Sequence, residues 1–252
     1  YEAGDYLAEN APQWTTWSGS TGGSEDVRIT DDQASSGTNS IFFEATGMSG
    51  GPQDVVLPFG GLKTDGIFDF SMMVYIPADG SGYFNFQGAQ TIGETWAMDC
   101  YIEDNGRLSI GTGQTIQLVT DYNKQEWFEI RIRADLTNNL WSLYIDGECL
   151  GAFSNPTNRV SHLDLFPLSG DAFYVDDVSY TYETDAPTIS RDVAIAGIEW
   201  GTGRLAGTSS SLNIGLKNNV GSTITSAMIN IDYNGAQFTE SLTDLTIEEG
   251  ET

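Results

Sequence analysis

The chain has 252 residues, with 36 acidic residues against 10 Lys and Arg, which gives a formal net charge of −26 at pH 7. A protein that binds DNA or RNA needs a basic surface to replace the counterions of the phosphates, so this charge excludes nucleic-acid binding. Hydrophobic residues make up 39% of the chain, enough for a core in one large domain or a large and a small one, but the apolar runs are far shorter than the roughly 20 residues of a membrane helix.

Short runs of alternating apolar and polar residues follow one another over residues 1–182, separated by turns rich in glycine. A period of two is typical of half-buried strands, and no segment has the period of a helix, so we expect an all-β, antiparallel fold. Asp104-Asn105-Gly106 and Asp146-Gly147 predict tight hairpin turns, because these residues adopt positive φ readily. The predicted strands are 40–45, 55–59, 68–76, 83–87, 96–102, 108–110, 127–134, 141–145 and 173–182.

The pattern breaks at residues 183–191, a polar stretch containing Pro187, which predicts a linker. A smaller β unit follows over 192–252, with the turn sequence Asn234-Gly235. This unit would lack its final strand and so leave a sheet edge unpaired. Because the chain also opens at Tyr1 without a signal peptide, we expect that a signal peptide has been removed or, preferably, that the sequence is part of a longer protein. The predicted strands of this unit are 192–200, 211–218, 223–233 and 236–242.

Several motifs of residues 1–182 resemble concanavalin A-like jelly-roll modules of the laminin-G and carbohydrate-binding-module class. This resemblance implies an antiparallel jelly-roll sandwich in a secreted or surface protein. The motifs are Tyr6-Leu7, WTTWSG at 14–19, SGTNSI at 36–41, WFEI at 127–130, WSLYIDG at 141–147 and FYVDDVS at 173–179.

Residues 192–252 resemble the CARDB family of Ig-like segments. The matching sequences are DVAI at 192–195, LNIGLKNN at 212–219 and GET at 250–252. A jelly roll followed by such a segment is similar to cargo of the bacterial type IX secretion route, although the sorting domain of such cargo is missing here. This resemblance predicts a partial, Ig-like second domain in a large bacterial surface or secreted protein.

The sequence does not contain the usual catalytic patterns of this fold class. Retaining glycosidases need two carboxylates on one face about 5–5.5 Å apart, and the Glu-x-Asp-x-x-Glu strand of the jelly-roll glucanases is missing. His162 is the single histidine and would have to be the base of any serine triad, but no Gly-x-Ser-x-Gly turn exists. We therefore predict a protein that is not an enzyme.

The jelly-roll resemblance implies a structural Ca²⁺ where the N-terminal segment meets the last strand. In related modules the ligands are an acid from each segment and carbonyls beside the Ser-Gly-x-x-Ser sequence. Carried over to this chain, the early acid is Glu2 or Asp26, the loop contributes Ser40 or its neighbours, and the last strand contributes Asp176 or Asp177. The alternative is that Asp176 faces solvent and Asp177 accepts backbone amides.

Sugars are bound by aromatic rings that stack on their C–H faces, beside polar groups that bond their hydroxyls. Alternation places Tyr83, Asn85 and Gln87 on one face of a strand and Phe84 and Phe86 on the other. The first set predicts a carbohydrate-binding face, which Trp96, Tyr101 and Trp141 would join. The alternative for each tryptophan is the core of the sandwich.

The two cysteines, Cys100 and Cys149, form either a single disulfide or two buried thiols. From all of these features we expect a non-catalytic extracellular module for binding or adhesion, with glycans or neighbouring copies or domains of the same surface protein as partners. Two alternatives remain: a structural segment of a surface filament or stalk without a ligand, and an accessory module of a secreted hydrolase.

Overall fold

The computed structural model describes residues 1–184, 193–200, 212–218, 223, 227–233, 236–243 and 245–248. The chain divides into two compact units, Tyr1–Ala186 and Pro187–Thr252. Most of the predicted linker lies outside the described residues. In the described part, no helix is long and apolar enough to cross a membrane.

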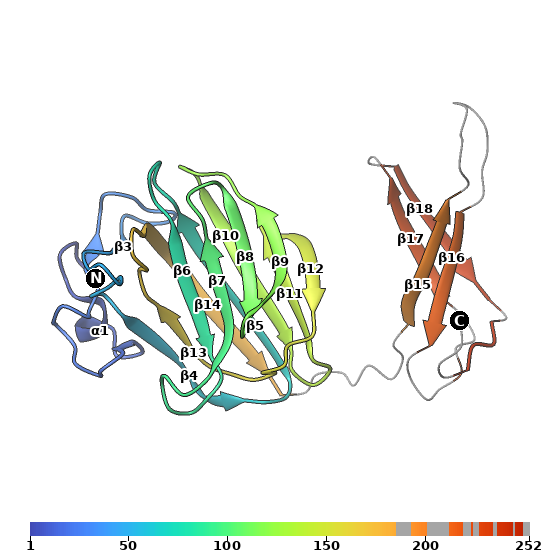
Figure 1. The fold of residues 1–252 in the computed structure, drawn as a ribbon, viewed down its shortest axis with the longest axis horizontal. Coiled ribbons are helices and arrows are strands. Elements are labelled where there is room, and N and C mark those ends of the chain that lie inside the picture. Colours follow the sequence, from blue (N-terminus) through green and yellow to red (C-terminus); the bar gives the residue numbers. More distant parts are fainter. Residues whose placement is uncertain are drawn as a thin grey trace. The chain divides into compact units, whose positions relative to one another are not determined.

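The first unit is a sandwich of two antiparallel sheets that face each other (Figure 1). This arrangement confirms the expected all-β fold. The first sheet has the strand order β1-β4-β13-β6-β7-β8-β9, and the second has the order β12-β11-β10-β5-β14-β3-β2. In the first sheet the strands are β1 (Thr15–Thr16), β4 (Val55–Lys63), β13 (Val160–Leu165), β6 (Gly82–Gln87), β7 (Trp96–Ile102), β8 (Arg107–Thr112) and β9 (Thr115–Asp121). In the second they are β12 (Glu148–Phe153), β11 (Leu140–Ile145), β10 (Trp127–Asp135), β5 (Ile67–Tyr75), β14 (Ala172–Glu183), β3 (Ser40–Glu44) and β2 (Ile29–Thr30).

The core fills the space between the sheets with side chains from every second strand position. Phe86 of β6 is fully buried and meets Phe70 of β5 edge-on at a centroid distance of 5.1 Å. On the same side of β6, Phe84 lies 6.4 Å from Phe70. Aromatic side chains bury large apolar areas and favour such tilted contacts, so this cluster joins the two sheets.

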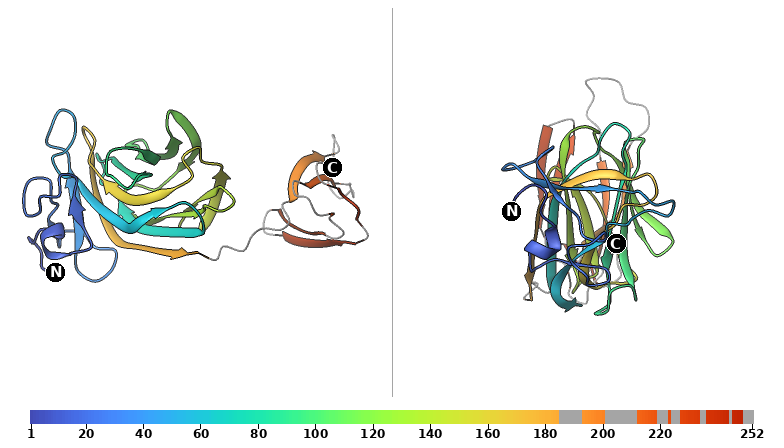
Figure 2. Two further views of the ribbon diagram at one scale, coloured as in Figure 1. Left: turned by 90° about the horizontal axis from the view of Figure 1, so that it is seen from below. Right: turned by 90° about the vertical axis from the view of Figure 1, so that its left-hand side faces the viewer.

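One helical turn, α1 (Leu7–Asn10), lies at the end of the sandwich that holds the N-terminus (Figure 2). The prediction of no helix is wrong for these four residues. The Asp26 carboxylate accepts the amides of Ala8 at 2.9 Å and Glu9 at 3.0 Å, which the start of a helix leaves unpaired. Because this capping group comes from far along the chain, the helix has no local capping signal.

The two predicted hairpin turns are present. Asp146 and Gly147 have φ of 49° and 80°, and Gly106 has φ of 85°. Positive φ at both central residues is the geometry that the two-residue turn between β11 and β12 requires.

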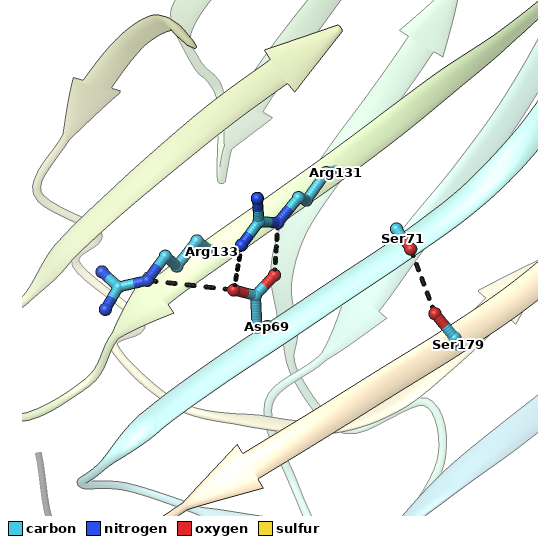
Figure 3. A network of polar contacts seen from close by, with 5 residues as sticks. All are labelled: Asp69, Ser71, Arg131, Arg133 and Ser179. Atoms are coloured by element: carbon cyan, nitrogen blue, oxygen red, sulfur yellow. Dashed lines mark hydrogen bonds and ion pairs between the residues drawn. The ribbon is translucent and has the colours of Figure 1, made fainter. Parts of the chain in front are cut away.

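The outer face of the second sheet carries an ion-pair network (Figure 3). Asp69 of β5 accepts Nε and Nη2 of Arg131 at 2.7 and 2.6 Å, and Nε of Arg133 lies 3.8 Å from it. Ser71 and Ser179 join β5 to β14 at 3.1 Å. The Arg131 side chain is 40% exposed, so solvent screens the pair, and we assign it a modest role in holding neighbouring strands together.

The described residues of the second unit form two antiparallel strand pairs. β15 (Val193–Trp200) pairs with β16 (Leu212–Asn218), and β17 (Ala227–Tyr233) pairs with β18 (Ala236–Leu242). β15, β16 and β18 match predicted strands within a residue, whereas β17 begins later than the predicted strand 223–233, since Thr223 is not in a strand. The predicted turn at Asn234-Gly235 lies outside the described residues. The resemblance of this unit to CARDB-like Ig segments stays a prediction.

The predicted disulfide is wrong, because both cysteines are free. Cys100 is buried in the core from β7, and Cys149 is exposed on β12 of the other sheet. The alternative of two buried thiols therefore holds for Cys100 alone.

Replacing Phe86 with Ala tests the aromatic core. We expect the free energy of unfolding to fall by about 3–5 kcal/mol, because the ring is fully buried among five other aromatic rings and its removal leaves a cavity. Urea unfolding measures the loss. Ile116→Ala, at a site 52% exposed, is the control and should change stability by less than about 0.5 kcal/mol; equal losses in both variants would contradict the packing.

Candidate functional site

The candidate site is the outer face of the first sheet over its three central strands, β13, β6 and β7, which lie side by side in Figure 1. Because Phe84 and Phe86 point into the core, the alternate residues of β6 point outward. In the register of the sheet, the outward residues of β6 lie beside His162 and Asp164 of β13 on one side and beside residues of β7 on the other. We call this surface the polar face; its members are Tyr83, Asn85, Gln87, Trp96, Asp99, Tyr101, His162 and Asp164.

A chain of hydrogen bonds runs along the floor of the polar face. The backbone amide of Gly93 donates to Gln87 Oε1 at 3.0 Å, Gln87 Nε2 donates to Asn85 Oδ1 at 2.5 Å, and Asn85 Nδ2 donates to Asp164 Oδ2 at 2.6 Å. Gln87, Asn85 and Asp164 are each at most 3% exposed. A buried polar group is costly unless it is paired, so this chain stabilises a floor that the flanking side chains cover.

The chain of hydrogen bonds ends at a pair of carboxyl groups, Asp164 and Asp54. Asp54 lies just before β4, which pairs with β13. Burial, followed by the charge of Asp164 and a hydrogen bond to it, raises the pKa of Asp54 to about 9. Burial also raises the pKa of Asp164, against the opposing effect of its hydrogen bond from Asn85. Asp54 is therefore protonated at neutral pH, where two ionised carboxylates side by side would repel each other.

The sequence analysis missed this pair. It did not predict the strand β13 that carries Asp164, and only the strand order shows that Asn85 and Asp54 are neighbours of this acid.

A second acid, Asp99, lies on the other side of β6. Tyr83 donates its hydroxyl to Asp99 Oδ1 at 2.7 Å, and burial raises the pKa of both side chains. The hydrogen bond opposes the effect of burial on Asp99. Asp99 Oδ2 accepts no hydrogen bond within the described part of the chain, so it is available as an acceptor for a ligand hydroxyl.

Two exposed aromatic side chains flank Asp99 on β7: Trp96 is 40% exposed and Tyr101 is 38% exposed. The Trp96 ring packs against Trp17 at a centroid distance of 6.2 Å, and Tyr101 packs against Tyr83 at 5.2 Å. The structure thus brings Trp96 and Tyr101 to the predicted face and adds Trp17, which comes from a separate loop.

The assignment of Trp141 to this face is wrong. Its side chain is fully buried and lies on β11 of the second sheet, 6.4 Å from Phe86. Its indole Nε1 donates to Asn158 at 2.9 Å. The alternation along β11 points Trp141 into the core, and the sequence alone did not show which face of that strand is inward.

His162 and Ser161 are in contact but do not make a nucleophilic site. Ser161 Oγ lies 2.7 Å from His162 Nδ1, and also 2.9 and 2.5 Å from the carbonyl oxygens of Gln87 and Ala89. Ser161 is fully buried, and burial lowers the pKa of His162, so the imidazole is neutral at pH 7. These contacts hold the strand rather than activate the hydroxyl.

Three of the candidate calcium ligands, Asp26, Asp176 and Asp177, accept hydrogen bonds from other groups of the protein. Asp26 caps α1 and accepts the amide of Gly22, while Asp176 accepts the amides of Ser35 and Ser36 and Asp177 accepts the Ser36 hydroxyl. A pocket at the N-terminal junction is lined in part by Ser40, Asp176 and Asp177, but Asp26 lines a different pocket.

Glu2 is exposed, and within the described residues no group of three or more acidic, His or Cys side chains is placed to hold a metal ion. The five candidates do not fit a shared site in this arrangement, and calcium binding stays a prediction.

No protein-family model matches the sequence, and no curated protein matches it. Among solved structures, the chain is similar to a sialidase, with a TM-score of 0.50 and 10% identity over 71% of this chain and 18% of the sialidase. It is also similar to the binding domain of botulinum neurotoxin serotype G, with a TM-score of 0.45 and 11% identity over 68% of this chain and 47% of that domain.

A third similar structure is the carbohydrate-binding module CBM66 from Bacillus subtilis, with a TM-score of 0.45 and 9% identity over 67% of this chain and 94% of the module. The chain spans less than a fifth of the sialidase and about half of the neurotoxin domain. At this identity the sialidase match shows a shared sandwich fold, as the jelly-roll resemblance predicts. It shows nothing of the ligand, and the type IX context stays a prediction.

Replacing Tyr83 with Phe tests the environment of Asp99. The pKa of Asp99 is raised in the folded protein. Above the ordinary aspartate pKa the folded protein therefore binds more protons than the unfolded chain, and the free energy of unfolding falls as pH rises and Asp99 ionises. Loss of the Tyr83 hydroxyl raises that pKa further. We expect a cost of about 1.5–3 kcal/mol at pH 7 and a smaller cost at pH 3, measured by urea unfolding.

Tyr101→Phe is the control, since the Tyr101 hydroxyl makes no hydrogen bond within the described residues. A cost for Tyr83→Phe that is independent of pH would contradict this account of Asp99.

Proposed function

We propose that the first unit is a non-catalytic glycan-binding module of an extracellular or surface-displayed protein, and that it binds sugars on the polar face. The observation that supports this proposal is the placement of two exposed aromatic rings, Trp96 and Tyr101, on either side of the available Asp99 carboxylate oxygen. Sugar rings present apolar C–H faces beside hydroxyl groups, so aromatic rings next to a hydrogen-bond acceptor complement them.

The charge of the face favours neutral glycans. Asp99 and the Asp54–Asp164 pair lie on or beside it, and the whole chain has a net charge of −26. A strongly negative field repels anionic ligands and slows their association. Sulfated or uronic-acid polymers are therefore weak candidates compared with neutral polysaccharides.

The carboxyl geometry supports binding rather than hydrolysis. Glycosidases place their two carboxyl groups about 5–9.5 Å apart, with the sugar between them. Asp54 and Asp164 are neighbouring carboxyl groups that affect each other's pKa, and Asp164 is 3% exposed, so a sugar does not fit between them. A role in adhesion would follow from display of this face on a larger surface protein.

Replacing Trp96 or Tyr101 with Ala tests the binding face. On an array of neutral glycans we expect the unchanged chain to bind, and either variant to lose affinity about tenfold or more, because each change removes a ring that stacks on the sugar. Titration calorimetry with the best glycan measures the loss.

Trp127→Ala is the matched control, because Trp127 is a half-buried tryptophan on the outer face of the second sheet. Equal losses in Trp96→Ala and Trp127→Ala would place the site elsewhere. The absence of any glycan binding by the unchanged chain would instead favour a structural segment without its own ligand.

A further inference from the structure

Two buried carboxylate oxygens lack a hydrogen-bond donor among the described residues: Asp54 Oδ1 and Asp164 Oδ1. These atoms belong to neighbouring carboxyl groups. A buried carboxylate without a donor is costly, and two such groups side by side cannot both be ionised without strong repulsion. A single proton shared by the two carboxyl groups removes this repulsion and supplies a donor.

We propose that Asp54 and Asp164 share one proton, and that this pair acts through Asn85 and Gln87 to position the loop that supports the Trp17–Trp96 platform. The positioning role in sugar binding rests on the proposed function, whereas the shared proton does not. Neither carboxyl group needs to touch a ligand, so both are positioning residues.

The location of the proton follows from the direction of the hydrogen-bond chain. A backbone amide can only donate, so Gly93 fixes Gln87 Oε1 as the acceptor and turns Gln87 Nε2 towards Asn85 Oδ1. Asn85 Nδ2 must then donate to Asp164 Oδ2. An ionised carboxylate is the better acceptor for this bond, which keeps the negative charge on Asp164 and the proton on Asp54.

The Gly93 end of the hydrogen-bond chain supports the aromatic rings of Trp17 and Trp96. A Cβ atom added at Gly93 would lie 2.8 Å from the Trp17 ring, so the loop packs closely against that indole. Trp17 in turn packs against Trp96. The Gly93–Gln87 bond therefore fixes the loop on which the orientation of Trp17, and with it Trp96, depends.

The groups around the pair offer no competing positive charge. Glu25 faces Asp54 and its charge adds to the rise in the Asp54 pKa, while Tyr83 lies near Asp164. Asp99 lies two strands away in the same row, and His162, two residues before Asp164, is neutral. No Lys or Arg contacts the pair in the part of the chain that the structure describes, so a proton is the available neutralising charge.

Asp54→Asn tests the shared proton, because asparagine keeps the shape of the neutral acid and can donate to Asp164 but has no proton to lose. We measure unfolding by urea from pH 6 to pH 10 without any glycan. The folded pKa of Asp54 is raised, so the unchanged chain should lose stability as pH rises towards about 9. Asp54→Asn should be stable at neutral pH. The fall of its unfolding free energy with pH should be smaller, by the release of about one proton.

Asp31→Asn is the matched control: it replaces an exposed aspartate and should keep the full pH dependence. The proposal is overturned if Asp54→Asn follows the same pH profile as the unchanged chain. It is also overturned if millimolar Ca²⁺ stabilises the unchanged chain but not Asp54→Asn, since the pair would then hold a cation.

Gln87→Ala tests the positioning role, because it removes the hydrogen bonds that connect the Asp54–Asp164 pair with the loop that contains Gly93. We expect the pH dependence to remain, while the near-ultraviolet circular dichroism of the tryptophans changes and affinity for the best neutral glycan falls. An unchanged tryptophan signal would overturn the positioning role. If no glycan binds the unchanged chain but the one-proton difference and the spectral change are found, the proposed function fails and this inference stands.

Discussion

The packing of two sheets through one aromatic core is the constraint on which the rest of the first unit depends. Phe84 and Phe86 of β6 must face Phe70 across the interior, so the residues between them have to face outward. Because β6 lies between β13 and β7, each outward side chain has neighbours on both sides. The polar face is thus a direct consequence of the core.

That central position also determines the electrostatics of the face. Outward side chains in the middle of a wide sheet are covered by their neighbours, as the burial of Asn85, Gln87 and Asp164 shows. Polar groups in such surroundings must pair with one another, and an acid there is most easily accommodated with a partner that neutralises it. The hydrogen-bond chain and the protonated Asp54 both follow from this requirement.

The sequence predicts what depends on local pattern. Alternation along the chain predicted β6 and its outward set Tyr83, Asn85 and Gln87, and turn chemistry predicted positive φ at Asp146 and Gly147. The prediction was incomplete, because it contained no strand at β1, β2, β9, β12 or β13. It could not predict contacts that depend on strand order. Asn85 and Asp164 are 79 residues apart in the chain, and Asp26 reaches the start of α1 from a distant loop. The assignment of Trp141 to the polar face was wrong for a related reason, because the pattern of a strand does not show which of its faces is inward.

The two parts of the polar face differ in exposure, and the proposed function gives them different roles. Trp96 and Tyr101 are accessible and can contact a ligand, whereas the buried floor can only hold them in place. Side chains on a β-sheet are precise supports, since each is fixed by cross-strand neighbours, while loops are not. Trp17 follows β1, and its backbone amide donates to the Asp54 carbonyl oxygen at 3.0 Å. The close approach of Gly93 to its ring adds a second connection to this surface, through Gln87. In the proposed arrangement, the Asp54–Asp164 pair therefore acts on the exposed aromatic rings through the hydrogen-bond chain, without contacting a ligand itself.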